Sequence, residues 1–417
     1  MVRWVALAPA LYFSAYFCLM LKAIHVRGFR SLAEVKVDLA PLVVLYGPTG
    51  SGKSSLLYAP LLLRNFIHEP NRQADSLFHL GFIHLGGWKD CLHQGYEDLG
   101  VSLTFEVQGH TITYGFFILK GENAHLNLTF DDALDLSGKV PLPYPLNQTF
   151  TGQVQIGSRA FNVQWNGITT IGVHLLREEG RAAEKVEPDT LRQWLNTPVE
   201  VVRRIYIAPP LRGFFRPSYA TTSLPSIPYK EEEIATLLLN DIDLQLDVSM
   251  YLEKVVGRQF RVTAPVGASM AYFHVLQSGT RTATLLVNDG FGVNQLVYVL
   301  TLLLHRQTEI CLLEEPEIHL HPSTQRLFVH AMADILNDFP QKQVLLTTHS
   351  EAFVAAILGA IRSGKLPLEK VRFYLVEREG RQTRFIPQLI TKEGQVEGGL
   401  ASFIEGELAD LAEFLGT

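Results

Sequence analysis

Hydrophobic and polar residues alternate with a period of two in several runs along the chain. The clearest runs cover residues 22–30, 34–39, 101–107, 111–119 and 124–130. A strand with one face in the core and the other in water produces this period, so we predict half-buried antiparallel strands. Turns that contain Gly109 and Gly121 separate the last three runs, and further short strands are expected over 150–173. The span 100–175 is therefore predicted to be a β-rich subdomain.

Other segments are continuously apolar or follow a helical period. Residues 43–46, 201–207, 310–313 and 343–346 are short apolar runs, which are typical of buried strands. Helical patterns cover 54–66, 231–256 and 296–305, and Pro60 is expected to kink the first helix or to end its regular part. Residues 371–377 and 383–387 predict a hairpin, and 398–415 predict a short terminal helix.

The first apolar strand runs into a glycine-rich loop and then into a helix. The loop has the spacing of a Walker A motif and consists of Gly47, Pro48, Thr49, Gly50, Ser51, Gly52, Lys53, Ser54 and Ser55. In such a loop the backbone N–H groups surround a β-phosphate, the lysine reaches the β and γ oxygens and the serine hydroxyl ligates Mg²⁺. Gly50 and Gly52 can take positive φ, which lets the backbone approach the phosphates. The sequence therefore predicts a nucleotide-binding P-loop.

Two adjacent acids follow the apolar run 310–313. The segment Glu314-Glu315-Pro316-Glu317 has the form of a Walker B motif, in which one carboxylate holds the Mg²⁺ shell and a second orients the attacking water. We assign Glu314 to the metal side and Glu315 to the water. The metal-side residue is usually Asp, so Glu314 departs from the pattern. The alternative interpretation is a solvated acidic turn.

Two further segments carry candidate phosphate contacts. His349 follows the apolar run 343–346, where a histidine can hydrogen-bond a γ-phosphate and sense its loss. Asn288-Asp289-Gly290-Phe291-Gly292 opens the helical run 296–305, and the glycines with the helix N-terminus make an anion site for a nucleotide held by another subunit. Arg212 and Arg216 lie in a rigid proline-rich stretch. That stretch is either a structured connector or a contact to phosphate or nucleic acid, and both interpretations stay open.

Composition narrows the class of protein. A length of 417 residues predicts two or three domains, and a net charge of −6 gives no overall footprint for nucleic acid. Cys18, Cys91 and Cys311 have no metal-ligand spacing and are too few for a disulfide framework, which fits a reducing compartment. His79, His84 and His93 are interpreted as ordinary strand or loop histidines.

The apolar run 4–21 has the length of a membrane span or a signal sequence. Lys22 follows directly and leaves no linker before the first predicted strand. We therefore favour the alternative that Met20 is the native start and that the preceding residues are an upstream extension. A cytoplasmic protein without a membrane partner is expected.

Together these segments resemble the ABC-type ATPases of the SMC, RecF and OLD group, and within it the single-chain AAA-type ATPases linked to phage defence. The resemblance extends from Met20 onward and rests on AIHVRGFRSL, GPTGSGKSS, LLEEPEIHLHP and TTHS, with support from YIAPPLRGFF and NDGFGVNQL. It implies an α/β P-loop fold of the ABC or SMC-head type, with a parallel core sheet, an antiparallel β subdomain and a helical insertion. It also implies a homodimer of two heads with ATP and Mg²⁺ between them.

By the same resemblance, Lys53 and Ser54 contact phosphate and Mg²⁺, Glu314 is the Walker B acid and Glu315 the catalytic carboxylate. His349 becomes the switch histidine, and Asp289-Gly290 the signature that faces the opposite nucleotide. The usual signature serine is not obvious, so Asp289, Gly290 and Asn294 stay alternatives. Gln94 is the candidate Q-loop residue, and His319 and His321 face the dimer or are structural.

The resemblance also divides the chain. We expect an apolar leader or upstream extension over 1–20, an N-terminal half of the ATPase head with P-loop and β-rich subdomain over 21–207, a connector and helical insertion over 208–280, and a C-terminal half of the head over 281–417. OLD-type relatives carry a nuclease domain. Only about 68 residues follow His349, so no such domain is expected here.

The sequence thus predicts an ATPase that hydrolyses ATP to ADP and uses head dimerisation as a switch, in DNA-related work or anti-phage defence. The alternative is a nucleotide-gated regulatory subunit with little turnover that controls a separate effector, such as a nuclease or toxin. A third interpretation, a membrane-anchored ATPase, depends on the run 4–21. Nucleic acid stays open as a partner.

Overall fold

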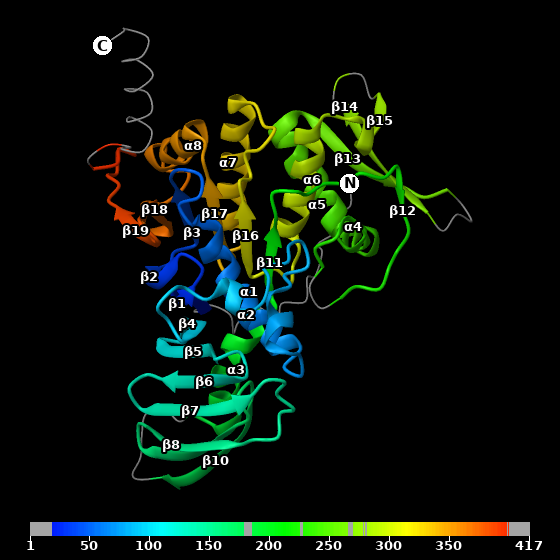
Figure 1. Cartoon of the computed structure of the whole chain (residues 1–417). Helices are drawn as coiled ribbons and strands as arrows, with labels where there is room; N and C mark the ends of the chain where they lie inside the picture. Colours follow the sequence, from blue (N-terminus) through cyan, green and yellow to red (C-terminus); the bar gives the residue numbers. More distant parts are fainter. Residues whose placement is uncertain are drawn as a thin grey trace.

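The protein has two lobes that share one elongated body (Figure 1). The computed structural model describes residues 19–178, 186–225, 228–265, 270–277, 279, 282–397 and 399. One lobe contains a mostly parallel sheet between helices, and the other is built from antiparallel strands. Residues 4–18 of the apolar run and the predicted helix 398–415, apart from position 399, lie outside the described residues, and the last three residues of that run begin the first strand. Among the described helices, none is both long and apolar enough to cross a membrane.

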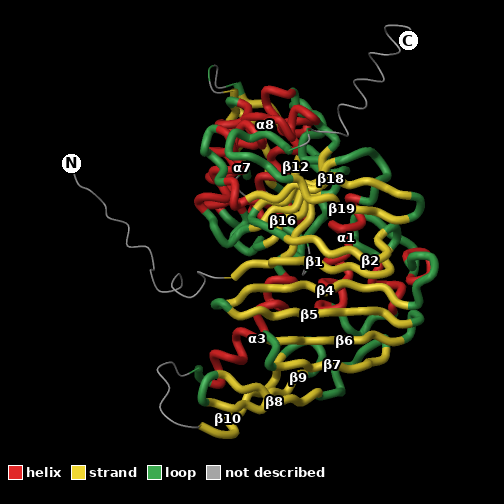
Figure 2. Tube along the Cα trace, turned by 90° about the vertical axis from the view of Figure 1, so that its left-hand side faces the viewer, coloured by secondary structure: helices red, strands yellow, loops and turns green. Residues whose placement is uncertain are grey.

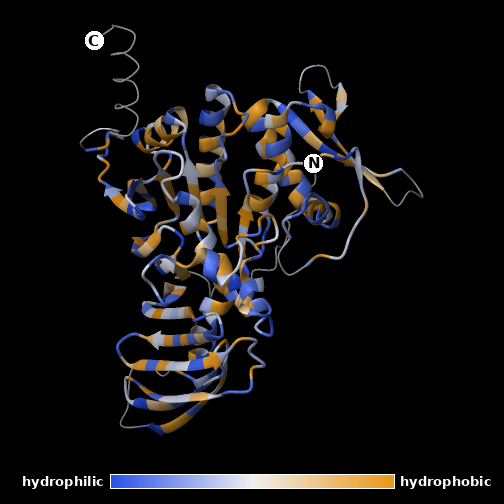
Figure 3. Ribbon diagram, viewed as in Figure 1, coloured by the Kyte–Doolittle hydropathy of each residue, from blue (hydrophilic) through white to orange (hydrophobic). Residues whose placement is uncertain are grey.

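A six-stranded sheet forms the centre of the first lobe. Its order is β11(Ile205–Ala208), β16(Ile310–Glu314), β17(Gln343–Thr348), β3(Leu42–Tyr46), β18(Val371–Glu379) and β19(Gln382–Gln388). The first five strands are parallel, and β19 returns antiparallel to β18 as the predicted hairpin. All residues of β3, β16 and β17 are buried, which explains the apolar residues at the centre of each strand (Figure 3).

Two hydrophobic cores cover the two faces of this sheet. Alternate residues of the strands point into each core, as Val43 and Val44 do. One core contains α1(Lys53–His68) and α3(Pro188–Arg203). The other contains α4(Glu231–Asn240), α5(Ile242–Val256), α6(Phe291–Leu304), α7(Pro322–Asp338) and α8(Glu351–Arg362). The strand ends are therefore held rigidly from both sides.

The second lobe begins with an antiparallel sheet (Figure 2). Its order is β2(Leu32–Asp38), β1(Leu19–Phe29), β4(Asp98–Val107), β5(His110–Leu119), β6(Asn123–Phe130) and β7(Leu134–Pro141). Helix α1 contacts both this sheet and the parallel sheet of the first lobe. A smaller sheet follows, formed by β10(Thr170–Glu178), β9(Arg159–Trp165) and β8(Phe150–Ile156). The predictions of an α/β fold, a parallel core sheet and an antiparallel subdomain are confirmed.

Several predicted elements differ from the structure. The helical run 231–256 is two helices, because the Asp241 side chain accepts a hydrogen bond from the Leu244 N–H at 3.0 Å and caps a new helix. The insertion also contains a sheet of β12(Ser218–Tyr219), β14(Ala271–Gln277), β13(Arg258–Thr263) and β15(Ala283–Leu285). Helix α1 continues past Pro60 to His68. Residues 201–203 finish α3 instead of starting a strand.

Short helical turns complete the chain. They are η1(Ala74–Phe78), α2(Trp88–Cys91), η2(Leu286–Asn288) and η3(Leu368–Lys370). Strand β7 was not predicted, because Ser137, Gly138 and Lys139 interrupt the apolar signal although the alternation continues. The division of the chain into four segments stays a prediction.

Candidate active site

The glycine loop connects β3 to α1 at the carboxyl edge of the parallel sheet. Gly50 and Gly52 have φ values of 78° and 104°, as the sequence predicts, and Gly52 is the N-cap of α1. A Cβ atom at Gly52 would lie 2.2 Å from Thr383 Oγ1, so only glycine fits there. Thr383 in turn donates to the Ser51 carbonyl at 2.7 Å. The β18–β19 hairpin therefore supports the loop from outside.

Lys53 is buried at the start of α1 and folds back over the loop. Its Nζ donates to the carbonyl oxygens of Gly47 and Pro48, both at 2.9 Å, and to Ser51 Oγ at 3.4 Å. Burial lowers the pKa of Lys53 to about 8, while Glu315, Glu317 and Glu314 act in the opposite direction. The charge of Lys53 therefore lies in the field of the three acids from the other half of the chain.

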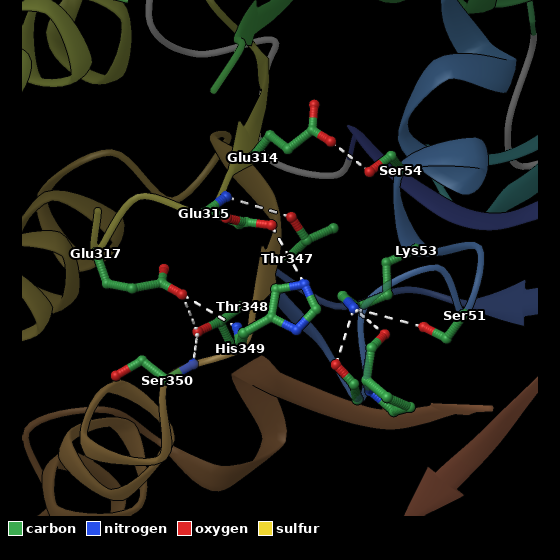
Figure 4. A network of polar contacts seen from close by, with 12 residues as sticks. Ser51, Lys53, Ser54, Glu314, Glu315, Glu317, Thr347, Thr348, His349 and Ser350 are labelled. Atoms are coloured by element: carbon green, nitrogen blue, oxygen red, sulfur yellow. Dashed lines mark hydrogen bonds and ion pairs between the residues drawn. The ribbon is translucent and has the colours of Figure 1, made fainter. Parts of the chain in front are cut away.

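Ser54 and Glu314 meet directly across the interface between α1 and β16 (Figure 4). The Ser54 hydroxyl donates to Glu314 Oε1, and the Tyr58 hydroxyl donates to Glu314 Oε2 at 2.6 Å. Glu314 is only 5% exposed. A hydroxyl and a carboxylate side by side next to a phosphate cradle are oxygen donors of the kind that Mg²⁺ takes, so the residues present fit this ion.

Glu315 follows at the end of β16, with a strained backbone and a histidine beside its side chain. Its φ is 46°, in the left-handed region. The Glu315 carboxylate lies 3.2 Å from His349 Nε2 (Figure 4). Burial and the nearby Lys53 lower the pKa of His349, so the imidazole is neutral at pH 7 and can donate one hydrogen bond to the carboxylate. The structure thus brings Lys53, Glu315 and His349 to one place.

Glu317 fixes the segment that carries His349. Its Oε1 accepts from Thr348 Oγ1 at 2.6 Å and from the His349 N–H at 3.1 Å. Its other oxygen, Oε2, is buried without a hydrogen-bond partner, and burial raises the pKa of Glu317. The third acid of the Walker B segment therefore holds the histidine and does not point at solvent.

A cavity of about 600 Å³ opens over these groups. Its lining includes Lys53, Ser54, Glu315 and His349, together with Gln94, the candidate Q-loop residue. Three basic residues that the sequence analysis missed also line it: Arg30, Arg378 and Arg381. Arg30 lies in the segment AIHVRGFRSL, which was a usable signal. Arg378 lies near the end of β18 and Arg381 in the turn before β19. No pattern in the sequence marked these two arginines as site residues.

The candidate signature residues do not line this cavity. Asp289 forms an ion pair with Arg258, and Asn294 is buried with its side-chain amide hydrogen-bonded to Phe214. Gly290 is the N-cap of α6, and a Cβ atom there would meet nothing within 4 Å. Of the three alternatives, only Gly290 presents an open backbone at the helix start, and Asn294 does not face outward.

The structure also bears on the interpretation of the two arginines. Arg212 is buried and donates to the carbonyl oxygens of Glu314 and Glu315 at 2.7 and 2.8 Å. Arg216 forms ion pairs with Glu231 and Glu232. Arg212 is therefore part of a structured connector and does not face solvent, whereas the exposed Arg216 leaves the second interpretation a prediction for that side chain.

Of the three histidines interpreted as ordinary strand or loop residues, His79 and His84 lie outside the cavity, whereas His93 lines it next to Gln94. His79 and His84 pair across a short β-bridge, and His93 Nδ1 lies 2.7 Å from the Arg30 carbonyl. The described residues contain no group of three or more His, Cys, Asp and Glu side chains placed to hold a metal. Cys91 and Cys311 are free and buried.

Comparison with known proteins gives matches to both sequence and structure. A family described as "AAA domain, putative AbiEii toxin, Type IV TA system" matches residues 42–355. The OLD nuclease of Thermus scotoductus is 23% identical over 360 residues, which cover 80% of this chain and 60% of that protein. The chain therefore spans less than two thirds of the length of this relative.

Solved structures of SMC heads are among the matches. The SMC head domain from Thermotoga maritima is 12% identical, with a TM-score of 0.45, over 89% of this chain and 99% of that one. The Smc head domain with an extended coiled coil, bound to the C-terminal domain of ScpA derived from Pyrococcus furiosus, is 9% identical, with a TM-score of 0.43, over 88% and 96%.

Proposed function

The chain belongs to the family described as AAA domain, putative AbiEii toxin, Type IV TA system, and is a P-loop ATPase of the SMC, RecF and OLD group; on that premise we propose that it binds Mg-ATP and hydrolyses it to ADP and phosphate. The observation that carries the proposal is the direct contact between Ser54 on α1 and Glu314 on β16. It supports the prediction that the phosphate cradle and the acid pair serve one nucleotide. A cytoplasmic location follows, because ATP is the substrate.

The chemistry would be in-line attack of water on the γ-phosphate. Lys53 leaves its loop carbonyls for the phosphate oxygens and neutralises charge that develops there. Glu315 orients the water, and neutral His349 holds the Glu315 carboxylate in place. Ser54 and Glu314 would hold Mg²⁺, which supplies further charge neutralisation when bound.

We further propose that two copies close on ATP. Support comes from Gly290, which opens α6 with free space around it but does not line the cavity that contains Lys53. A helix N-terminus is suited to a phosphate, and here that phosphate would belong to the nucleotide of a second copy. Binding would favour the closed dimer, and hydrolysis would release it. This cycle is the proposed switch, in DNA-related or anti-phage work.

Phosphate release by the purified chain tests the proposal. We expect Glu315→Gln to keep ATP binding and to lower turnover by about 10²-fold or more, because the water loses its positioning carboxylate. Glu106→Gln is the matched control, since Glu106 is a half-exposed acid on β4 paired with Lys22. Undiminished phosphate release by Glu315→Gln would remove the assignment of Glu315.

A regulatory subunit is the second candidate. It would bind ATP with little turnover and control a separate nuclease or toxin. The family description names a toxin and a toxin–antitoxin system, which favours this alternative. Phosphate release measured with and without DNA separates the two: a motor-like ATPase turns over and responds to DNA, whereas a regulatory subunit binds ATP and hardly hydrolyses it.

A further inference from the structure

Residues 209–215 bring a buried guanidinium to the back of the acid pair. Arg212 is 2% exposed. Its Nη1 donates to the carbonyls of Pro209 and Glu314 at 2.8 and 2.7 Å, and its Nη2 donates to the Glu315 carbonyl at 2.8 Å. The planar fork of an arginine suits two neighbouring acceptors, which a lysine cannot match. One side chain thus binds the main chain of both Walker B acids.

The Glu315 backbone needs this support. A non-glycine residue in the left-handed region is strained and persists only where its surroundings fix it. The Glu315 N–H donates to Thr347 O at 3.1 Å and to Thr347 Oγ1 at 3.2 Å, while its carbonyl accepts from Arg212. The Glu315 carbonyl also accepts from the Ile318 N–H at 3.2 Å, within the same turn. Without Arg212 only that longer bond remains on the carbonyl side, so we expect the backbone to relax and the carboxylate to move.

The same segment is tied to helix α6. The Phe214 N–H donates to Asn294 Oδ1 at 2.6 Å, and Asn294 Nδ2 donates to the Phe214 carbonyl at 2.8 Å. Asn294 is 4% exposed and lies in the first turn of α6, close after Gly290. Gly213 has a φ of 134°, and a Cβ atom there would lie 2.8 Å from Asn294 Oδ1. The loop and the helix are therefore in close contact.

We propose that Arg212 is a positioning residue that fixes the backbone of Glu314 and Glu315, and that residues 209–215 link this pair to the start of α6. The inference rests on the proposed function, because positioning matters only if the acid pair serves hydrolysis. A displacement at Gly290, where a second copy would contact the chain, reaches Arg212 through Asn294 and Phe214. The segment then couples closure of the dimer to the geometry of the acids.

The test compares two buried arginines that both bind backbone carbonyls. Arg64 is 1% exposed and donates to the Ile205 carbonyl at the opposite end of β11, so Arg64→Gln is the control for loss of a buried arginine. We expect Arg212→Gln to lower kcat for phosphate release by about 10²-fold. The KM for ATP should change by less than about threefold, because the interaction acts on the reacting geometry and not on ground-state binding.

Two further variants complete the comparison. Arg212→Lys keeps the charge, and its kcat should lie between those of the wild type and Arg212→Gln. Asn294→Ala touches neither acid and is expected to lower kcat by about 3- to 30-fold, the usual range for coupling through a packed network. Unchanged kcat in a folded Asn294→Ala variant overturns the link to α6. Equal kcat in Arg212→Gln and Arg64→Gln overturns the positioning role. If Arg212→Gln does not fold, the kcat of Arg212→Lys is compared with that of Arg64→Gln in its place.

A structural readout separates this inference from the proposed function. If the wild type releases no phosphate, the proposed hydrolysis fails, and crystal structures of Arg212→Gln or Arg212→Lys decide the inference. We expect Glu315 to leave the left-handed region in Arg212→Gln, with its carboxylate displaced from His349. An unchanged Glu315 backbone in that variant overturns the inference.

Discussion

The Tyr58 hydroxyl donates a hydrogen bond to Glu314 Oε2 across 2.6 Å, and this contact joins the P-loop helix to the end of β16. The two residues are 256 positions apart in the sequence. Burial, with the carboxylate of Glu314 as a second cause, raises the pKa of Tyr58. Tyr58 therefore stays a hydrogen-bond donor at neutral and moderately alkaline pH, and it orients the acid assigned to Mg²⁺.

Removal of this hydroxyl should weaken the metal site. In Tyr58→Phe, Glu314 Oε2 loses its partner, which costs about 1–3 kcal/mol in a buried setting. We expect a lower melting temperature and a higher Mg²⁺ concentration for half-maximal phosphate release. Tyr114→Phe is the matched control, because the Tyr114 hydroxyl donates to the Gly167 carbonyl at 2.7 Å in the β subdomain. Identical Mg²⁺ dependence in both variants would contradict the role given to Tyr58.

ATP binding should weaken above pH 8. Burial lowers the pKa of Lys53 from 10.5 to about 8, so its charge is lost as the pH rises through that value. A bound phosphate favours the charged form, and binding then takes up a proton. We expect affinity to fall by about tenfold between pH 7 and 9, because each pKa unit is worth about 1.4 kcal/mol.

Calorimetry in two buffers with different ionisation enthalpies measures that proton uptake. Lys53→Met should bind weakly with a flat dependence on pH. Absence of proton uptake on ATP binding at pH 8.5 in the wild type would show that a charged Lys53 is not needed to bind ATP.

A charge at the start of α6 should block the dimer without unfolding the chain. Gly290 has an ordinary φ of −61° and open space around it, so Gly290→Glu fits the single chain. An added carboxylate there would repel the phosphate of a second copy. In a Glu315→Gln background with ATP, light scattering should show dimers that Gly290→Glu abolishes.

Gly359→Glu is the control for this prediction. Gly359 is exposed on α8 and also has nothing within 4 Å of an added Cβ atom. It should leave the dimer intact. Dimers that persist in Gly290→Glu would argue against contact through this helix end.

Acid should destabilise the protein through His305. Its ring packs against Tyr206, its Nδ1 has no partner, and burial, with Lys342 nearby, lowers its pKa to about 4. In the unfolded chain His305 binds a proton as the pH falls through about 6.5, whereas in the folded chain it binds one only near pH 4. Stability therefore falls as the pH drops through this window, by about 3 kcal/mol.

Melting curves at pH 7 and pH 4.5 test this effect. His305→Phe keeps an aromatic ring against Tyr206 and should show a smaller difference between the two melting temperatures. His174→Phe, at an exposed position on β10, should behave as the wild type. An equal loss in all three proteins would place the acid sensitivity elsewhere.

Local patterns predicted most elements of the fold and failed where a single side chain changed the outcome. The strands around the P-loop and the meander from β4 to β6 follow from hydrophobic periodicity. The break between α4 and α5 does not, because the apolar pattern is continuous and only the Asp241 cap starts a new helix. Residues 201–203 are apolar enough for a strand, yet packing in one core makes them the last turn of α3.

The sequence by itself was enough to predict the P-loop, the Walker B acids and His349. Each of them directly follows a short apolar strand, so the residues next to it in the chain are sufficient to locate it. Only the tertiary structure decided which groups hold them: Tyr58 on Glu314, Arg212 on the two carbonyls, and Thr383 on the P-loop. These contacts join residues far apart along the chain, and their distances are set by how the sheet brings separate strand ends together, which no local pattern encodes.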